Sequence, residues 1–202
     1  MGIMNASIIL AHPNPESFNH AIANAAREAF LAAGWEVNFH DLYAEKFDPL
    51  LPAVELLRGA ILPPEIQRHC DEIVPADAIV VVHPNWWGQP PAILRGWQDR
   101  VLRMGVAYRF GMNAEGEGVP HGLLKAQWAL VFTTSNTSQE KDQIMFGDPL
   151  ENLWGRCVLG FCGVKSVTRQ NFDVIITSTM QQRTTWLDQT RELVRDSCRP
   201  RG

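Results

Sequence analysis

SIILAHPNPESFNHAIANAAREAFLAAG, residues 7–34, predicts a strand, a short loop and a helix in immediate succession. The apolar run at 7–11 favours a buried strand, and it stops abruptly at His12. Pro13 and Pro15 follow, and proline prevents either a strand or a helix from continuing through this point. This order of elements is typical of the first βα unit of an α/β sheet.

The helix of this segment begins at a polar cap and ends at a glycine. Ser17 or Asn19 supplies the cap, and Gly34 occupies the position after a helix that favours glycine. Its first turn offers unpaired backbone N–H groups and the positive end of the helix dipole, close to His12. The loop therefore suits a phosphate group, although an ordinary, well-capped βα unit shows the same pattern. The apolar residues recur at helical spacing at Ile22, Ala26, Ala29, Phe30 and Ala33.

The whole chain has 202 residues, which suits one domain, residues 1–202, with a substantial core. Its contents of 46% hydrophobic and 20% charged residues are ordinary for a globular protein. The net charge of −4 argues against nucleic acid as a partner, and no apolar run is long enough to span a membrane. The N-terminus lacks a signal-peptide pattern, so we expect a cytoplasmic protein.

Cysteines and histidines form no recognisable metal or redox motif. The four cysteines make no CxxC pair, and we expect them to be packing residues in a reducing compartment. The six histidines show neither HExxH nor HxxxH spacing, so we expect no metal site.

Beyond residue 34 the sequence continues to alternate strands with helices. Strands are predicted at 36–41, 77–83, 126–133 and 163–172, and helices at 53–59, 65–73, 92–104, from 148 or 149 to 161, and 179–198. Residues 105–125 and 134–147 are long connections without a clear period. The last helix is expected to turn Trp186, Leu187, Thr190, Leu193 and Val194 inward. Five strands alternating with helices predict a three-layer, doubly wound α/β sandwich.

Ligands of such sheets bind beyond the carboxyl ends of the strands, where the loops 12–18, 83–91 and 133–147 should meet. In the second loop, Trp86 and Trp87 are adjacent and lie between prolines, so both cannot easily point inward. Core packing would account for one of them, whereas an exposed aromatic ledge suits a flat ligand or an interface. Six short polar residues at the start of the third loop favour a hydrogen-bonding wall or a solvated turn.

These three loops together offer an anion site, an aromatic ledge and a polar edge at one rim of the sheet. A flavin nucleotide has a phosphate, a flat tricycle and a pyrimidine edge, and so matches all three. We therefore expect a bound flavin, and the sequence leaves open whether it is FAD or FMN.

Two motifs, AHPNPESFNHA at 11–21 and NWWGQPPAILRGW at 85–97, resemble the NAD(P)H:quinone oxidoreductases of the flavodoxin-like fold. Further agreement lies at 106–108, 133–134, 147–148 and 161–163. The resemblance implies a parallel sheet of strand order 2-1-3-4-5, a flavin, and a homodimer with the active site at the subunit interface. It also implies an NAD(P)H dehydrogenase (quinone) activity.

Site residues carried over from the resemblance fall into four groups. It places His12, Ser17, Phe18, Asn19 and Ala21 at the flavin phosphate, and Asn85, Trp86, Trp87 and Gly88 at the isoalloxazine ring. It places Thr133, Thr134 and Asn136 at the polar edge of the ring, and Tyr108 in the pocket where nicotinamide and acceptor bind in turn. Several of these contacts are expected from the backbone. Tyr108 and Asn136 are the residues expected to act in catalysis.

The chain departs from the family pattern in the third loop. The family carries Thr-Thr-Gly-Gly, whereas this chain has TTSN at 133–136, which restricts a close approach of the backbone to the flavin. The family also uses a tyrosine and a histidine to stabilise charge on the reduced flavin. Phe146 stands in the place of that histidine, and no tyrosine lies between Thr133 and Gly147. Backbone N–H groups, Asn136 or Lys141 are the candidates to replace them.

The function expected from these features is hydride transfer from NAD(P)H through the flavin to a quinone or a similar flat acceptor. Because both substrates share one pocket, we expect ping-pong kinetics. Two alternatives remain open: an ancillary flavoprotein that regulates a potassium-efflux or other membrane system, and an electron carrier like flavodoxin. The choice between NADH and NADPH and the identity of the acceptor also remain open.

Overall fold

A five-stranded parallel sheet forms the centre of the protein in the computed structural model, which describes residues 2–57 and 59–199. Its strand order is β2-β1-β3-β6-β7, and every neighbouring pair is parallel. The strands are β1 (Asn5–Leu10), β2 (Glu36–Asp41), β3 (Ala78–Pro84), β6 (Trp128–Thr134) and β7 (Ser166–Phe172). Counted within this sheet alone, the order is 2-1-3-4-5, which confirms the predicted fold class.

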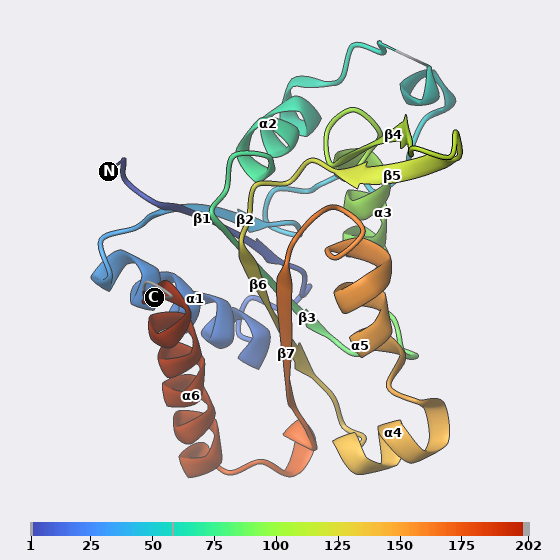
Figure 1. Ribbon diagram of the computed structural model, residues 1–202. Coiled ribbons are helices and arrows are strands. Elements are labelled where there is room, and N and C mark those ends of the chain that lie inside the picture. Colours follow the sequence, from blue (N-terminus) through green and yellow to red (C-terminus); the bar gives the residue numbers. More distant parts are fainter. Residues whose placement is uncertain (1, 58, 200–202) are drawn as a thin grey trace.

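Helices cover both faces of the sheet (Figure 1). On one face lie α1 (Phe18–Ala32) and α6 (Met180–Cys198), and on the other lie α2 (Pro64–Ile73), α3 (Ala92–Val101) and α5 (Pro149–Asn152). Every residue of β3 and β6 is buried, as expected for central parallel strands covered on both sides. Alternate residues of each strand point to opposite faces, which divides the core into two clusters on either side of the sheet.

The two longest helices begin and end as the sequence predicts. Ser17 caps α1 by accepting the backbone N–H of His20, and Gly34 follows with a φ of 79°. Thr179 and Gln182 form a reciprocal capping box at the start of α6. The predicted inward side of α6 packs against the α1 face of the sheet, with Thr190 and Val194 fully buried.

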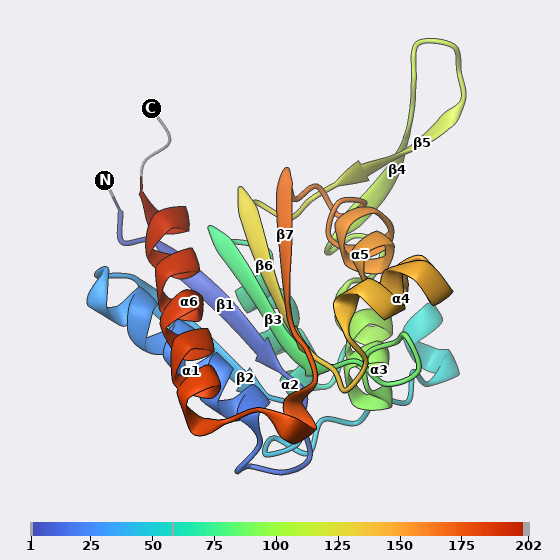
Figure 2. The same ribbon diagram turned by 90° about the horizontal axis from the view of Figure 1, so that it is seen from below.

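Four predicted segments differ from the structure, and one of them is the predicted helix at 53–59, where the described residues form only a short 3₁₀ turn at Ala53–Leu56. Residues 105–125 contain an antiparallel hairpin of β4 (Tyr108–Met112) and β5 (Gly118–Gly122), which projects from the body of the protein (Figure 2). Residues 134–147 contain α4 (Gln139–Phe146). The predicted helix at 149–161 is a single turn, α5, that continues into a π-helical segment at Leu153–Val158.

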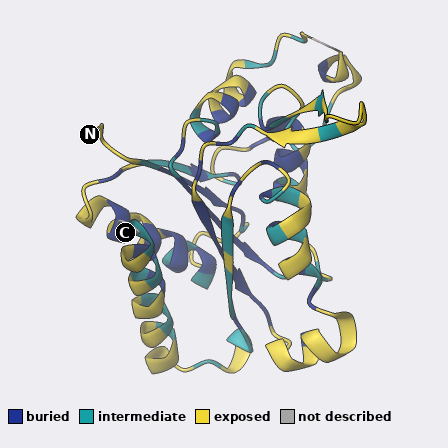
Figure 3. Ribbon diagram, viewed as in Figure 1, coloured by how far each residue is buried: buried dark blue, intermediate teal, exposed yellow. Residues whose placement is uncertain are grey.

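These differences have local causes. The hairpin closes at Gly116, whose φ of 80° needs glycine, and its strands are mostly exposed, so no apolar period marks them. Helix α4 is also almost wholly exposed (Figure 3), and therefore lacks the apolar stripe by which a helix is recognised. Short 3₁₀ turns at Ala53–Leu56 and Ile175–Thr177 complete the elements. Among the described residues, no helix combines the length and apolar character that crossing a membrane requires.

Candidate functional site

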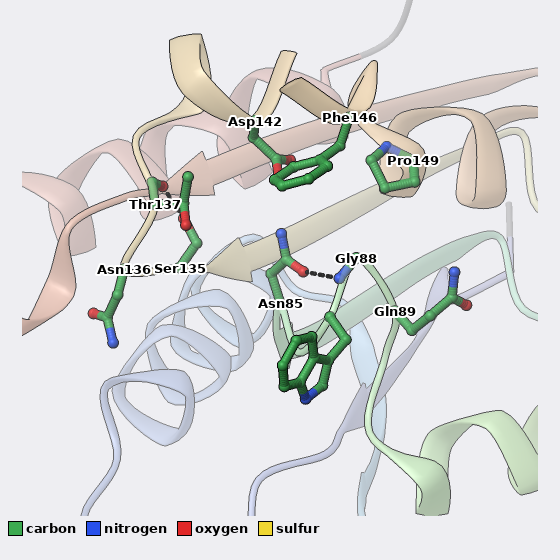
Figure 4. A pocket seen from close by; sticks show the side chains of 10 residues that line it. Asn85, Gly88, Gln89, Ser135, Asn136, Thr137, Asp142, Phe146 and Pro149 are labelled. Atoms are coloured by element: carbon green, nitrogen blue, oxygen red, sulfur yellow. Dashed lines mark hydrogen bonds between the residues drawn. The ribbon is translucent and has the colours of Figure 1, made fainter. Parts of the chain in front are cut away.

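A cavity of about 580 Å³ lies beyond the carboxyl ends of β3 and β6 (Figure 4). Its volume falls within the range of small-molecule sites. Loops from both strands and the helices α4 and α5 enclose it. Its lining residues are Asn85, Trp87, Gly88, Gln89, Ser135, Asn136, Thr137, Asp142, Phe146 and Pro149.

The loop after β3, which carries Trp86 and Trp87, forms a tight turn at the mouth of this cavity. Trp86 and Gln89 exchange two backbone hydrogen bonds of 3.0 Å, and the two residues between them, Trp87 and Gly88, have φ values of 59° and 70°. Two successive residues of positive φ are typical of a type I′ hairpin turn, which favours asparagine and glycine rather than tryptophan. A bulky residue held in this conformation is strained, and such strain collects at binding sites.

This turn leaves both indoles accessible. Trp87 is fully exposed and Trp86 is 42% exposed, so neither belongs to the core. The ring of Trp86 lies 6.2 Å from that of His12, measured between centroids, which brings the loop after β1 beside the loop after β3. The structure therefore confirms the predicted exposed ledge at the rim where the loops meet.

Two asparagine hydrogen bonds hold the turn in place. The side-chain oxygen of Asn85 accepts the backbone N–H of Gly88 at 2.9 Å (Figure 4), and the backbone N–H of Asn85 donates to the carbonyl of Thr134 at 2.7 Å. The second bond ties the loop after β3 to the end of β6. Gly88 is required here because a Cβ atom would lie 2.9 Å from Cγ of Pro149.

A buried histidine fixes the end of β3, just before the turn. His83 is fully buried at the end of β3, where its Nδ1 donates to the carbonyl of Pro84 at 2.8 Å. Its Nε2 accepts the indole N–H of Trp154 at 2.9 Å. Because an indole only donates, this pair of bonds selects the neutral tautomer with its proton on Nδ1. Burial lowers the pKa of His83 to about 4, which keeps the ring neutral under ordinary conditions.

The start of α1 lies at the same edge of the sheet. The hydroxyl of Ser17 lies 2.9 Å from Nδ1 of His20, and Nε2 of His20 lies 2.8 Å from the carboxylate of Asp41. Nδ1 of His12 accepts the backbone N–H of Asn14 at 3.1 Å, and burial lowers the pKa of His12. With Nδ1 of His12 accepting, its Nε2 carries the proton, and this group and the backbone N–H groups at the start of α1 are donors of the kind that a phosphate needs.

Two of the predicted polar residues bond to one another across the fold. The carboxamide of Asn19 and the hydroxyl of Thr134 are 2.8 Å apart, although 115 residues separate them in the chain. Both side chains are buried. This bond fastens the start of α1 to the end of β6, so it positions the site rather than facing the cavity.

Several predicted contacts are not available as side-chain contacts. Thr133 is completely buried. Its hydroxyl donates to Asn171 at 2.8 Å and accepts from Arg169 at 2.9 Å, so it has no free position for a ligand. The ring of Phe18 packs against Phe172 and Trp186 in the core. For these residues, as for Ala21 in the first turns of α1, only the backbone remains for the predicted phosphate or ring contacts.

Asn136 and Tyr108 occupy different surroundings. Asn136 lines the cavity but points away from Asn85 and Asp142 (Figure 4), and its side-chain oxygen accepts the backbone N–H of Ile176 at 3.1 Å. Tyr108 lies on β4, edge-on to Phe110 and Phe161, and lines a separate, wider groove of about 800 Å³. The cavity of a single chain does not include it.

The structure adds a group of charged residues that sequence reasoning missed. Asp142 on α4 lines the cavity, and Asp148, at the N-cap of α5, is buried with a φ of 50°. Arg169 on β7 pairs with Asp148 and lies 3.2 Å from the carboxylate of Glu151. Ser138 as an N-cap, acidic residues in the next turn and Gly147 at the far end would have signalled α4. The position of Arg169 beneath the site has no local sequence signal.

A second cluster, formed by His40, Glu45 and His69, has its ligand atoms within 4.8 Å of one another. The indole of Trp97 donates to Nδ1 of His69 at 3.2 Å, which leaves the proton of a neutral ring on Nε2, 3.1 Å from Glu45. A protonated nitrogen cannot bind a metal. We therefore interpret the cluster as a set of hydrogen bonds that fastens β2 to α2. Burial alone would raise the pKa of Glu45, but its bonds to both histidines lower it to about 2.

The cysteines only partly match the expected packing role. All four are free thiols; Cys70 and Cys162 are buried, and burial raises the pKa of each to about 11. Cys157 is exposed on the π-helical segment, so the prediction was wrong for that residue.

A doubly wound parallel sheet with a cavity beyond its strand ends and a capped helix at the same edge defines a protein of flavodoxin-like architecture. A model of the flavodoxin-like fold family matches residues 4–192, and the chain belongs to that family.

Named relatives agree with this assignment. An uncharacterized NAD(P)H oxidoreductase of Haemophilus influenzae is 39% identical over 178 residues, which cover 84% of this chain and 83% of that protein. NAD(P)H dehydrogenase [quinone] 1 of Cavia porcellus is 37% identical over 191 residues, covering 83% of this chain and 68% of that protein. The solved structure of an NAD(P)H:quinone oxidoreductase from Methanothermobacter marburgensis superposes with a TM-score of 0.81 at 26% identity, over the full length of both chains.

Proposed function

We propose that this protein is a flavin-dependent NAD(P)H oxidoreductase that passes a hydride from NAD(P)H to a quinone or a similar flat acceptor. The observation that carries the proposal is the meeting of three features at one edge of the sheet. These are the strained, exposed turn at Trp87, the capped start of α1 at Ser17, and the cavity between the turn and α4. The names of the relatives support the same class of reaction.

The residues of this edge fit a flavin nucleotide. The first turn of α1 and the side chains of Ser17 and His12 offer hydrogen-bond donors to a phosphate. Trp86 and Trp87 offer apolar faces to a flat ring, since both are exposed. Ser135 and Thr137 close the polar side of the cavity, where a pyrimidine edge needs partners. A bound flavin supplies the capacity to accept and return a hydride, which no amino-acid side chain provides.

The chain's own contribution is binding, orientation and exclusion of water. The hydrogen bond from the backbone N–H of Gly88 to the side chain of Asn85 fixes the shape of the turn, and the bond from the hydroxyl of Thr134 to Asn19 fixes α1 relative to β6. Both therefore hold the phosphate end and the ring end at a constant separation. A hydride donor and an acceptor that reach the same exposed ring face must bind in turn, which favours ping-pong kinetics.

We also propose that the protein acts as a homodimer, with Tyr108 contributing to the site of a second copy. Tyr108 does not line the cavity of its own chain, and it stands within an exposed apolar surface. The surface includes Met104, Phe110, Met112 and Phe161, each between 37% and 70% exposed. A surface of this kind is typical of a subunit interface.

The chromophore tests the proposal most directly. The purified protein should be yellow, and the mass of the extracted chromophore will decide between FAD and FMN. Double-reciprocal plots with NADH or NADPH and a quinone should give parallel lines. A colourless protein that binds no riboflavin derivative would exclude the function proposed here, and intersecting lines would exclude the shared pocket.

A further inference from the structure

One carboxyl group, that of Asp142, faces the cavity from α4. Asp142 is only 9% exposed and lines the cavity together with Phe146, across from Asn85 (Figure 4). An aspartate near the start of a helix ordinarily caps a backbone N–H. Here Ser138 already performs that role, and within the described part of the chain no hydrogen bond to the Asp142 carboxyl is found. Among residues 2–57 and 59–199 this carboxyl group therefore has no bonded partner, and it is open to a ligand.

The surroundings of Asp142 raise the pKa of its carboxyl group. Arg169 on β7 is the neighbouring cation, but it pairs with Asp148 and Glu151 of α5 and donates to Thr133. One guanidinium shared between two carboxylates leaves little attraction for a third. Burial raises the pKa of Asp142, and the charge of Asp148 raises it further, against a smaller lowering by Arg169.

We propose that Asp142 is a catalytic residue of the cavity, whose protonated carboxyl group donates a hydrogen bond to an acceptor atom at the polar edge of the bound flavin. The inference rests on the proposed function. A hydride carries two electrons and one proton, so its transfer from NAD(P)H adds one negative charge to the acceptor. A donor at the polar edge stabilises that charge, whereas an ionised carboxylate opposes it. No bond to Asp142 forms or breaks.

The position of Asp142 on α4 supports this role. Asp142 and Phe146 lie four residues apart on the same face of α4, and both line the cavity. The side chain of Asn136, the alternative donor, points away from Asn85 and Asp142, and its oxygen accepts the backbone N–H of Ile176. Asp142 is the one acidic residue among the described residues that line the cavity. It is therefore the side chain of the cavity that can gain or lose a proton.

The experiment compares flavin-loaded wild-type protein with Asp142→Asn, Asp142→Ala and Glu140→Gln. Glu140 lies on the same helix but is exposed and does not line the cavity, so its variant controls for the loss of one negative charge. Two quantities are measured against pH: the midpoint potential of the bound flavin and kcat/KM for NAD(P)H. Flavin absorbance reports that each variant is loaded.

The wild type should lose kcat/KM as the pH rises through the pKa of Asp142, and its midpoint potential should show a break in slope at the same pH. Asp142→Asn keeps a neutral donor, so both pH effects should disappear while activity at low pH is retained. Asp142→Ala removes the donor and should lower kcat by about tenfold to a hundredfold, the effect of one hydrogen bond to a charged group. Glu140→Gln should match the wild type.

Unchanged pH profiles of both the rate and the potential in Asp142→Asn would overturn the role of Asp142 while leaving the proposed function intact, because the flavin would still be bound and reduced. Failure of the wild type to bind flavin would overturn both.

Discussion

The imidazole of His20 joins the carboxylate of Asp41 to the hydroxyl of Ser17, with distances of 2.8 Å on one side and 2.9 Å on the other. Ser17 is the N-cap of α1, and it also accepts the backbone N–H of His20. Asp41 lies at the end of the neighbouring strand β2. The chain of contacts therefore runs from an edge strand of the sheet to the helix end proposed for the flavin phosphate.

Asp41→Asn should weaken binding of a phosphorylated flavin. The Asp41 carboxylate orients the ring of His20, and that ring contacts the hydroxyl of Ser17 at the proposed phosphate site, so loss of the carboxylate loosens this end of the site. We expect the dissociation constant for riboflavin 5′-phosphate to rise about fivefold, which corresponds to roughly 1 kcal/mol. Fluorescence titration of the flavin measures it. Riboflavin, which lacks the phosphate, serves as the control, and an equal loss for both ligands would contradict this placement of the phosphate.

Trp87→Gly should make the protein more stable but a poorer flavin binder. The fully exposed Trp87 has a φ of 59°, and relief of such a conformation is worth about 1 kcal/mol. The lost aromatic face should raise the flavin dissociation constant by about fivefold to tenfold. Urea unfolding and flavin titration measure the two effects. Lys46→Gly is the matched control, because Lys46 is exposed with a φ of 53° and lies outside the cavity. Equal flavin binding by Trp87→Gly and the wild type would contradict the proposed stacking of Trp87 on the flavin.

Gly88→Ala should impair flavin binding beyond its effect on the backbone. The added Cβ would lie 2.9 Å from Cγ of Pro149, and the φ of 70° is unfavourable for alanine by about 1–2 kcal/mol. Gly116→Ala carries a similar penalty at a φ of 80°, with nothing within 4 Å of its Cβ. Both variants should lose stability in thermal unfolding, but only Gly88→Ala should bind flavin more weakly. Weaker binding by both would assign the effect to general destabilisation.

The stability of the protein should fall with acid because His83 is buried in its neutral form. Its folded pKa of about 4 lies below the ordinary value of 6.5, so the unfolded chain takes up the proton first. The stability that the neutral His83 contributes is fully present above pH 6.5, and it is lost as the pH falls towards 4. Between pH 7.5 and pH 5 the free energy of unfolding should decrease by about 2 kcal/mol from this group.

Urea unfolding of His83→Gln at several pH values tests this assignment. The variant should be less stable at pH 7.5, since the bond to Trp154 is disturbed, but its stability should depend less on pH. His12 and His69, whose pKa values burial also lowers, contribute the remaining dependence. An unchanged pH dependence in His83→Gln would contradict the role of burial at this residue.

Local pattern accounts for most of what could be predicted of the site. The sequence 7–34 contains a strand, a breaker, a cap and a terminating glycine within one segment, and all four appear where expected. Trp86 and Trp87 are exposed because two bulky residues between prolines cannot both enter the core. In contrast, α4 has no buried stripe and therefore lacked the usual helical signal, so Asp142 was not recognised.

The amino-acid sequence by itself determined the alternation of elements, the strand order through its resemblance to a known family, and the edge of the sheet at which the loops meet. Periodicity and capping act over a few residues, so the order of the strands and helices can be predicted from the sequence. Only the tertiary structure decided which polar groups face the cavity. Thr133 turns inward because Arg169 and Asn171 bind it from β7, whereas Asp142, for which the described residues offer no bonded partner, turns to the cavity. Such choices depend on desolvation and on partners far away in the sequence, and neither is encoded in a local pattern.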